Sequence, residues 1–204
     1  MDILSHGLWG AVISAAAGNK KGPTGKPEPR LKPLLGFFWG IFPDLISFAP
    51  VTIIFLYGGV FGGLDLTHLP RPEHVVNLVP QLPVIYWLTL AIYNLSHSAI
   101  IFLAAFLGTW LVRYYHHRHS GRRLALGSAP VWEMSAWLFH IILDIPTHSN
   151  EFFPTPFLWP ATNVHFDGLP WSQTPWVMVL NFCALGASYL MLRRSKRKLA
   201  MAKS

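Results

Sequence analysis

Long apolar runs are the feature that most restricts how this chain folds. Five stretches of 16 to 30 residues carry very few charged side chains: residues 3–18, 34–57, 83–112, 124–145 and 176–192. A helix needs about 20 apolar residues to cross the ~30 Å hydrocarbon core of a bilayer. The sequence therefore predicts an all-α, multi-pass integral membrane protein with about five membrane helices. The first run is short, so we expect it either to span or to dip into the membrane and return.

Charge and composition support this class and exclude others. Only 12% of the 204 residues are charged, about half the share of a typical soluble domain. The net charge of +7 would suit nucleic acid, but the basic residues gather in short loops beside the apolar runs, so we expect membrane lipids and no nucleic acid as partners. The single cysteine, Cys183, excludes an internal disulfide and a thiolate zinc cluster. We expect one membrane-embedded domain over residues 1–204, and the oligomeric state stays open.

The basic residues also predict an orientation. Fifteen of the sixteen Lys and Arg side chains lie in the segments 19–33, 113–123 and 193–204, and Arg71 is the exception. Five crossings put these three segments on one side of the membrane, which the positive-inside rule makes cytoplasmic. We therefore expect a bacterial inner-membrane protein with a cytoplasmic C-terminal tail at 193–204.

Ionisable side chains inside the apolar runs are the second informative feature. Each costs about 2.5–3.5 kcal/mol at the centre of a membrane helix, so such residues are expected to face one another or a wet cavity. The chain has six of them: His6, Asp44, His97, Glu133, His140 and Asp144. Imidazole and carboxylate groups are ligands of Zn²⁺ and similar ions, which makes a shared metal centre one hypothesis. Separate polar contacts between helices are the alternative.

The stretch 137–160 holds three of the candidate residues at regular spacing. His140, Asp144 and His148 are four residues apart each time, which places the first two on one face of a helix. Pro146 is expected to end this helix near Asp144 or Ile145 because it removes an N–H and disfavours the preceding helical turn. His148 would then lie on a turn that bends back toward Asp144. It would be a further ligand, a residue that holds a ligand in place, or a base.

Four pieces of the sequence resemble the bacterial family of membrane-bound metal-dependent hydrolases. They are MDILSHG, FPDL, YNLSHS, and FHIILDIPTHS with the following FFPTPFLWP. The resemblance implies ligands for a divalent metal ion, with Zn²⁺ expected, at these positions: His6, Asp44, His97, His140 and Asp144. His148 or Glu133 would act as the base. The His-x3-Asp helix is also faintly similar to zinc-dependent phospholipase C.

Two departures from the family pattern bear on a second metal ion. Ile46 stands where many members have a second Asp, and Ile92, Tyr93 and Asn94 replace a His-Arg-Gly.

We expect a hydrolase that uses metal-activated water to cleave a phosphodiester or ester, including a lipid, in a cavity open to the extracytoplasmic side. The alternatives are a metal or proton transporter that uses the same His/Asp line, and a non-catalytic membrane protein.

The orientation is tested by cysteines placed singly at Lys26, Ser120 and Ser204. All three should resist an impermeant thiol reagent in intact cells and react once the membrane is permeabilised, because positive loops stay in the cytoplasm. Labelling of any of the three from outside would contradict the orientation.

Overall fold

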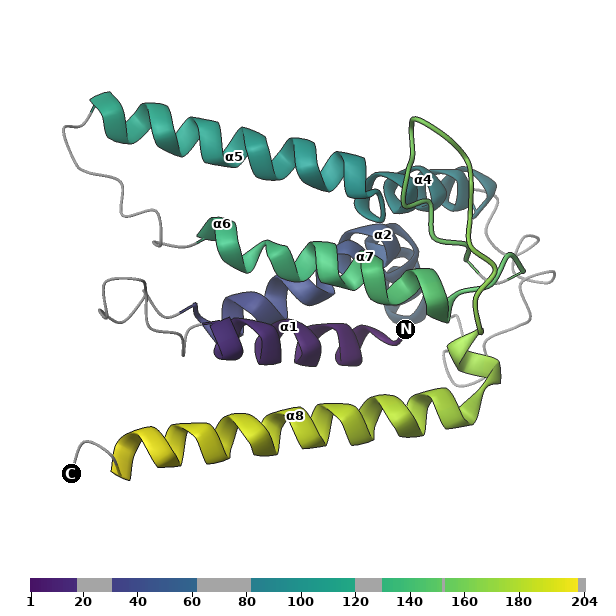
Figure 1. The fold of residues 1–204 in the computed structure, drawn as a ribbon. Coiled ribbons are helices and arrows are strands. Elements are labelled where there is room, and N and C mark those ends of the chain that lie inside the picture. The colour runs from purple at the N-terminus through teal and green to yellow at the C-terminus, as the bar shows by residue number, and fades with distance from the viewer. Residues whose placement is uncertain (18–30, 62–81, 120–129, 152, 202–204) are drawn as a thin grey trace.

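The computed structural model describes residues 1–17, 31–61, 82–119, 130–151 and 153–201 of the chain. Within these ranges every regular element is a helix (Figure 1). The elements in chain order are α1 (Ile3–Ala17), α2 (Pro33–Phe61), α4 (Leu82–Ser96), α5 (Ala99–His119), α6 (Pro130–Glu133), α7 (Ser135–Thr147), the 3-10 helix η1 (Trp171–Gln173) and α8 (Pro175–Met201).

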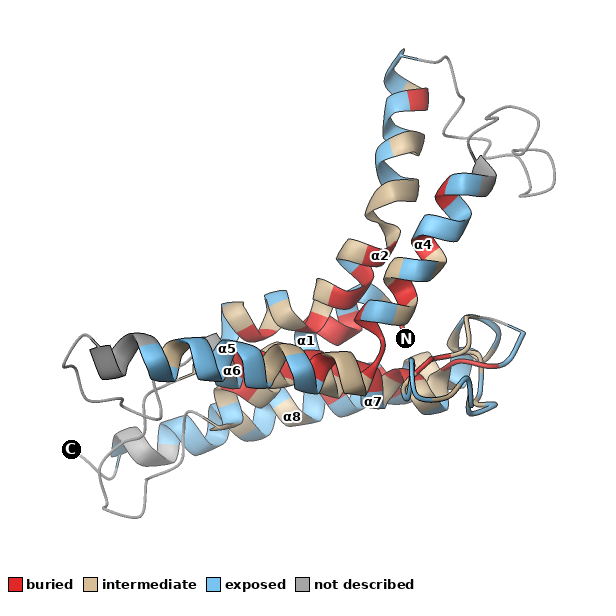
Figure 2. Cartoon of the chain, turned by 90° about the horizontal axis from the view of Figure 1, so that it is seen from above, coloured by how far each residue is buried: buried red, intermediate tan, exposed pale blue. Residues whose placement is uncertain are grey.

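The helices form two parts that meet at a buried junction. The helices α1, α5, α7 and α8 lie with their long axes roughly parallel (Figure 1). Figure 2 shows one half of α2 beside α4, at a steep angle to the other helices, with buried residues gathered where the two parts meet. The expected all-helical class is thus present, and this junction is where the polar residues of the apolar runs converge.

Glycines let α1 and α2 approach closely. A methyl group at Gly10 would collide with the backbone of Gly36, and one at Gly40 would collide with the backbone of His6. Small residues at such spacing allow membrane helices to pack backbone against backbone. The contact places His6 directly beside Gly40, four residues before Asp44 on the neighbouring helix.

Two prolines lie inside α2, and the first one sits at the junction. Pro43 has no N–H to donate along the helix. One turn later the Ser47 hydroxyl donates to the Pro43 carbonyl oxygen at 2.7 Å, and its Oγ also lies 2.7 Å from Oγ of Ser96. Asp44 is therefore held where α2 meets the end of α4.

A break separates α4 from α5 at Ser96, His97 and Ser98. The two helices are bent by 64° relative to each other. The Ser98 hydroxyl accepts a hydrogen bond from the Ile101 N–H at 3.2 Å, as an N-cap does, and the Ala99 N–H donates to the Phe157 carbonyl at 2.9 Å. The loop after α7 thus fixes the break and the position of His97.

The structure gives about three candidate membrane spans rather than the five predicted. Among the described residues two helices, α2 and α8, are long and apolar enough to cross alone, and the bent pair α4–α5 makes a third if it counts as one span. α1 has 15 residues and α7 has 13, so they rise only about 23 and 20 Å. Part of the fourth predicted run, residues 124–129, lies outside the described residues.

The C-terminal end of α7 differs from the prediction by about two residues. The helix continues through Pro146 to Thr147, and His148 is the first residue with extended backbone. Its N–H still donates to the Asp144 carbonyl at 3.0 Å, which holds His148 against the last helical turn. Pro146 therefore precedes the change of direction instead of ending the helix before it.

Candidate metal centre

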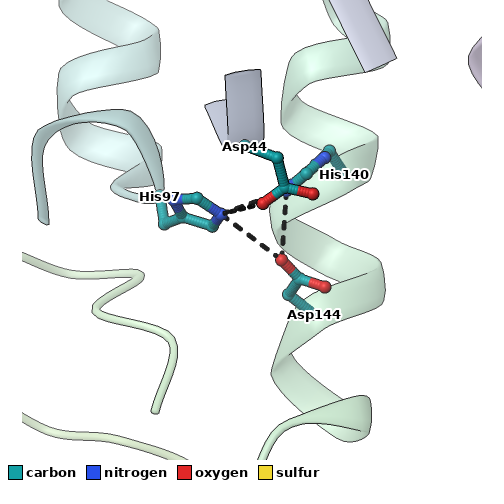
Figure 3. A group of neighbouring side chains, drawn as sticks. All are labelled: Asp44, His97, His140 and Asp144. Carbon is teal, nitrogen blue, oxygen red and sulfur yellow. Dashed lines mark hydrogen bonds and ion pairs between the residues drawn. The ribbon is translucent and has the colours of Figure 1, made fainter. Parts of the chain in front are cut away.

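Two histidines and two aspartates from three parts of the chain meet at the junction. Asp44 comes from α2, His97 from the break between α4 and α5, and His140 and Asp144 from one face of α7 (Figure 3). One potential ligand atom of each residue lies within 4.8 Å of those of the other three. All four side chains are buried, which makes the cluster a site and not a surface patch.

The hydrogen bonds behind the two imidazoles fix which ring nitrogen faces the centre. Nδ1 of His140 lies 2.6 Å from the Gly40 carbonyl, and Nδ1 of His97 lies 3.2 Å from the Tyr93 carbonyl. A carbonyl oxygen only accepts, so each Nδ1 donates. Oγ of Ser96, 2.8 Å from Nδ1 of His97, donates to the Tyr93 carbonyl and can therefore accept from that ring. In the neutral rings both Nε2 atoms then carry lone pairs, and they face each other at 3.1 Å. Such outer hydrogen bonds orient the histidine ligands of metal ions.

The carboxylates add negative charge at the same point. Oδ2 of Asp144 lies 3.1 Å from Nε2 of His140 and 3.5 Å from Nε2 of His97, yet it has no hydrogen-bond partner of good geometry among the described residues. Oδ1 of Asp44 lies 3.4 Å from Nε2 of His97. Buried charges of one sign are costly unless a cation compensates them. The Met1 ammonium pairs with Oδ1 of Asp144 at 2.6 Å, but among the described residues no ammonium or guanidinium group pairs with Oδ2 of Asp144 or with Asp44. A single proton can bridge only one nitrogen–oxygen pair, whereas one divalent ion could contact all four donors.

The donor set therefore fits a divalent metal ion. Two imidazole nitrogens and two carboxylate oxygens give four donors, the number that Zn²⁺ most often takes from proteins. The absence of sulfur and the mixture of nitrogen and oxygen also suit other first-row divalent ions. The geometry supports a metal site but does not select the metal.

His6, the fifth predicted ligand, lies against this group on the α1 side. Its Nε2 is 2.9 Å from Oδ1 of Asp144, and its ring stacks on that of His140 with centroids 3.6 Å apart. Its Nδ1 is buried and has no hydrogen-bond partner among the described residues. The structure thus brings all five predicted ligands together, while their role as ligands stays a prediction.

His148 turns back toward the cluster and contacts it from the end of α7. Its Nε2 lies 3.7 Å from Oδ1 of Asp144 and 3.1 Å from the amino nitrogen of Met1. Its Nδ1 lies 3.2 Å from the Tyr93 hydroxyl, which itself donates to the Phe153 carbonyl at 3.0 Å. Because the Tyr93 proton is used there, Nδ1 of His148 is the donor and Nε2 accepts a hydrogen bond from the Met1 ammonium. Burial above all lowers the pKa of His148 to about 4, so the ring is neutral at pH 7.

Glu133, the other predicted base, lies outside the cluster. It ends α6, and its Oε1 accepts a hydrogen bond from the Lys32 N–H at 2.8 Å. Seven residues separate it from His140, which is about 10 Å along a helix. In the sequence Glu133, His140 and Asp144 fit one helical stripe, but α6 ends at Glu133 and α7 begins at Ser135. Glu133 is therefore not placed to exchange protons at the site.

Several residues that orient the site have no sequence signature. The Tyr93 hydroxyl and the Thr155 hydroxyl, 3.4 Å from Nδ1 of His148, hold that ring, and the Gly40 carbonyl holds His140. Tyr93 also stacks on His97 one turn later, with centroids 3.9 Å apart. The only sequence signal for Tyr93 is its position four residues before His97. A backbone carbonyl such as that of Gly40 has no signal in the sequence.

A cavity of about 400 Å³ opens next to the cluster. Asp44, Tyr93 and His148 contribute its polar wall, and Phe48, Phe153 and Trp171 contribute aromatic surface. Ile3 and Leu4 also line it and are about half exposed. An apolar cavity with a few convergent polar groups is the usual form of a small-molecule site.

Comparison with known proteins places the chain in a family. Residues 1–203 match the sequence model of the YdjM inner membrane protein family. The chain belongs to this family. No match was found among curated proteins or among solved structures. Membership in the YdjM inner membrane protein family agrees with the apolar helices and with the predicted location in an inner membrane.

Metal retention distinguishes the roles of Asp144 and His148. Asp144→Ala removes a carboxylate at the centre, so this variant of the YdjM family member should lose its bound ion during purification. His148→Ala removes a group that contacts Asp144, which should weaken metal binding about 10–100-fold. Elemental analysis of the detergent-purified proteins measures both, with Glu133→Gln as the control for a buried carboxylate outside the cluster. If His148→Ala keeps full metal and Asp144→Ala also does, the cluster does not hold the ion.

Proposed function

We propose that this protein is a membrane-bound metal-dependent hydrolase that cleaves a phosphodiester or ester, with lipids among its substrates, from the extracytoplasmic side. The observation that carries the proposal is the convergence of two imidazole nitrogens and two carboxylates beside a cavity of about 400 Å³. The motifs that resemble membrane-bound metal-dependent hydrolases add support, because the residues that they align are those that converge.

The site residues divide into those that would bind the metal ion and one that would accept and return a proton. Asp44, His97, His140 and Asp144 would hold the divalent ion, with His6 beside them. When bound, such an ion lowers the pKa of a coordinated water toward ~7 and polarises a phosphoryl or carbonyl oxygen. His148 is neutral, lies beside Asp144 and lines the cavity, and its Nε2 would accept a proton from an attacking water once the Met1 ammonium releases it.

Tyr93 and Thr155 keep His148 in the tautomer that this role needs. Their hydroxyls lie 3.2 and 3.4 Å from Nδ1, on the side of the ring away from the cluster. In the reaction a water O–H bond breaks and its oxygen forms a bond to phosphorus or carbon. The ester oxygen leaves with the pair of electrons from its broken bond and takes up the proton that His148 returns.

The compactness of the cluster favours hydrolysis over transport. A transporter that passes an ion or proton along a His/Asp line predicts ligands at staggered depths in the membrane. Here the four ligand atoms lie within 4.8 Å of one another, as in a single binding site. A purely structural site would need no cavity, yet His148 and Asp44 line one.

Turnover of chromogenic and lipid esters tests the proposal. The zinc-loaded protein in detergent micelles is assayed with bis(p-nitrophenyl) phosphate, p-nitrophenyl butyrate and phosphatidylglycerol. Asp44→Asn should abolish hydrolysis, and His148→Gln should lower kcat about 10²–10⁴-fold, the usual contribution of a general base. Glu133→Gln should leave the rate unchanged, because Glu133 lies outside the cluster.

Two results would contradict the hydrolase. One is a metal-loaded protein that releases neither nitrophenol nor a lipid product from any of the three substrates. The other is hydrolysis that survives Asp44→Asn at the wild-type rate, which would assign the activity to a contaminant.

A further inference from the structure

A second, larger groove lies between α1 and α8. The two helices run side by side in the same chain direction (Figure 1). The groove has a volume of about 780 Å³ and includes none of the residues of the metal cluster. Its walls are mainly apolar and include Leu8, Val12, Phe182, Leu185, Tyr189 and Leu192.

The groove exists because the two helices are joined at one end, and the small residues beyond that point leave the space between the helices unfilled. Asn181 joins them: its amide nitrogen donates to Oγ of Ser5 at 2.7 Å, and its Oδ1 accepts from Nε1 of Trp9 at 2.8 Å. Further along, Ala11 and Gly186 face the groove, and a methyl group added at Gly186 would meet no atom within 4 Å. Among the described side chains of α8 only Asn181 and Leu185 are buried, so this helix is barely covered by the rest of the protein.

Positive charge is concentrated at one end of the groove. Arg193, Lys196 and Arg197 all line it and are exposed. Their i, i+3 and i+4 spacing puts the three side chains on one face of α8. In the part of the chain that the structure describes, no carboxylate pairs with any of them.

We propose that this groove binds one anionic phospholipid, whose phosphate contacts Arg193, Lys196 and Arg197 and whose acyl chains lie along the apolar walls. Basic pockets between membrane helices are the kind of site that holds anionic lipid head groups. An apolar channel that ends in three cations without a described carboxylate partner matches an acyl chain joined to a phosphate, and the open space at Gly186 leaves room for the chain.

A second copy of the protein is the less suitable occupant. Two copies in the same membrane have the same orientation, so a partner helix α8 in the groove would bring its own three cations to the same depth. No described carboxylate is available there to compensate them, and like charges at close range repel.

Lipid binding by the full chain in detergent tests the proposal. The delipidated protein is titrated at fixed ionic strength with dioleoylphosphatidylglycerol or dioleoylphosphatidylcholine, and bound lipids are counted by native mass spectrometry. Each nearby basic residue contributes roughly fivefold to the binding of an anionic lipid, so the wild type should prefer phosphatidylglycerol by at least about tenfold. The triple variant Arg193→Gln/Lys196→Gln/Arg197→Gln should lose that preference.

Matched variants separate the groove from the general charge of the helix. Arg197→Gln should lower the preference about fivefold, while Arg194→Gln, on the same helix but outside the groove, should leave it unchanged. Gly186→Leu should block binding of both lipids by filling the groove. Gly108→Leu is its control, because a methyl group there also meets no atom within 4 Å but Gly108 lies on α5.

Three results would overturn the proposal. They are equal binding of the two lipids by the wild type, a preference that survives the triple variant, and a dimer that Gly186→Leu dissociates. None of these readouts depends on hydrolysis or on bound metal.

Discussion

The rest of the structure depends on one unfavourable contact at the junction. There the electron-rich atoms of His97, His140 and Asp144 approach one another. Two Nε2 lone pairs face each other at 3.1 Å, and Oδ2 of Asp144, which has no hydrogen-bond partner among the described residues, is equally close to one of them. In a low-dielectric interior this arrangement is stable only with positive charge between the groups. A divalent ion bound at this point would therefore help to hold the helices together as well as supply the proposed chemistry.

The fold supplies this arrangement through irregular backbone. Close packing at Gly40 sets His6 beside α2 and leaves the Gly40 carbonyl free to orient His140. The 64° bend between α4 and α5 turns His97 into the junction, and the turn after Thr147 does the same for His148. Breaks of this kind at membrane depth are tolerated where they are buried in protein or line a wet cavity. Each of them lies at the site.

The sequence predicted the helical membrane class, and it singled out the five residues that converge because ionisable groups in apolar runs are conspicuous. It did not predict the span count, since α1 with 15 residues and α7 with 13 are too short to cross the hydrocarbon core alone. Glu133, one of the two residues expected as the base, lies outside the cluster, and the helix is interrupted at Met134 between Glu133 and His140. α8 extends nine residues past the predicted 192 because Lys and Arg are good helix formers, so the basic tail does not end it. The supporting contacts of Tyr93 and Gly40 depend on tertiary structure alone.

X-ray absorption spectroscopy at the zinc edge tests the central claim most directly. For the zinc-loaded protein the account predicts a first shell of nitrogen and oxygen at about 2.0–2.1 Å, with the outer-shell scattering of two or three imidazoles. His97→Ala should reduce the imidazole scattering, whereas Glu133→Gln should leave the spectrum unchanged. A first shell of water oxygens alone, or a spectrum that His97→Ala does not alter, would contradict a metal centre at this junction.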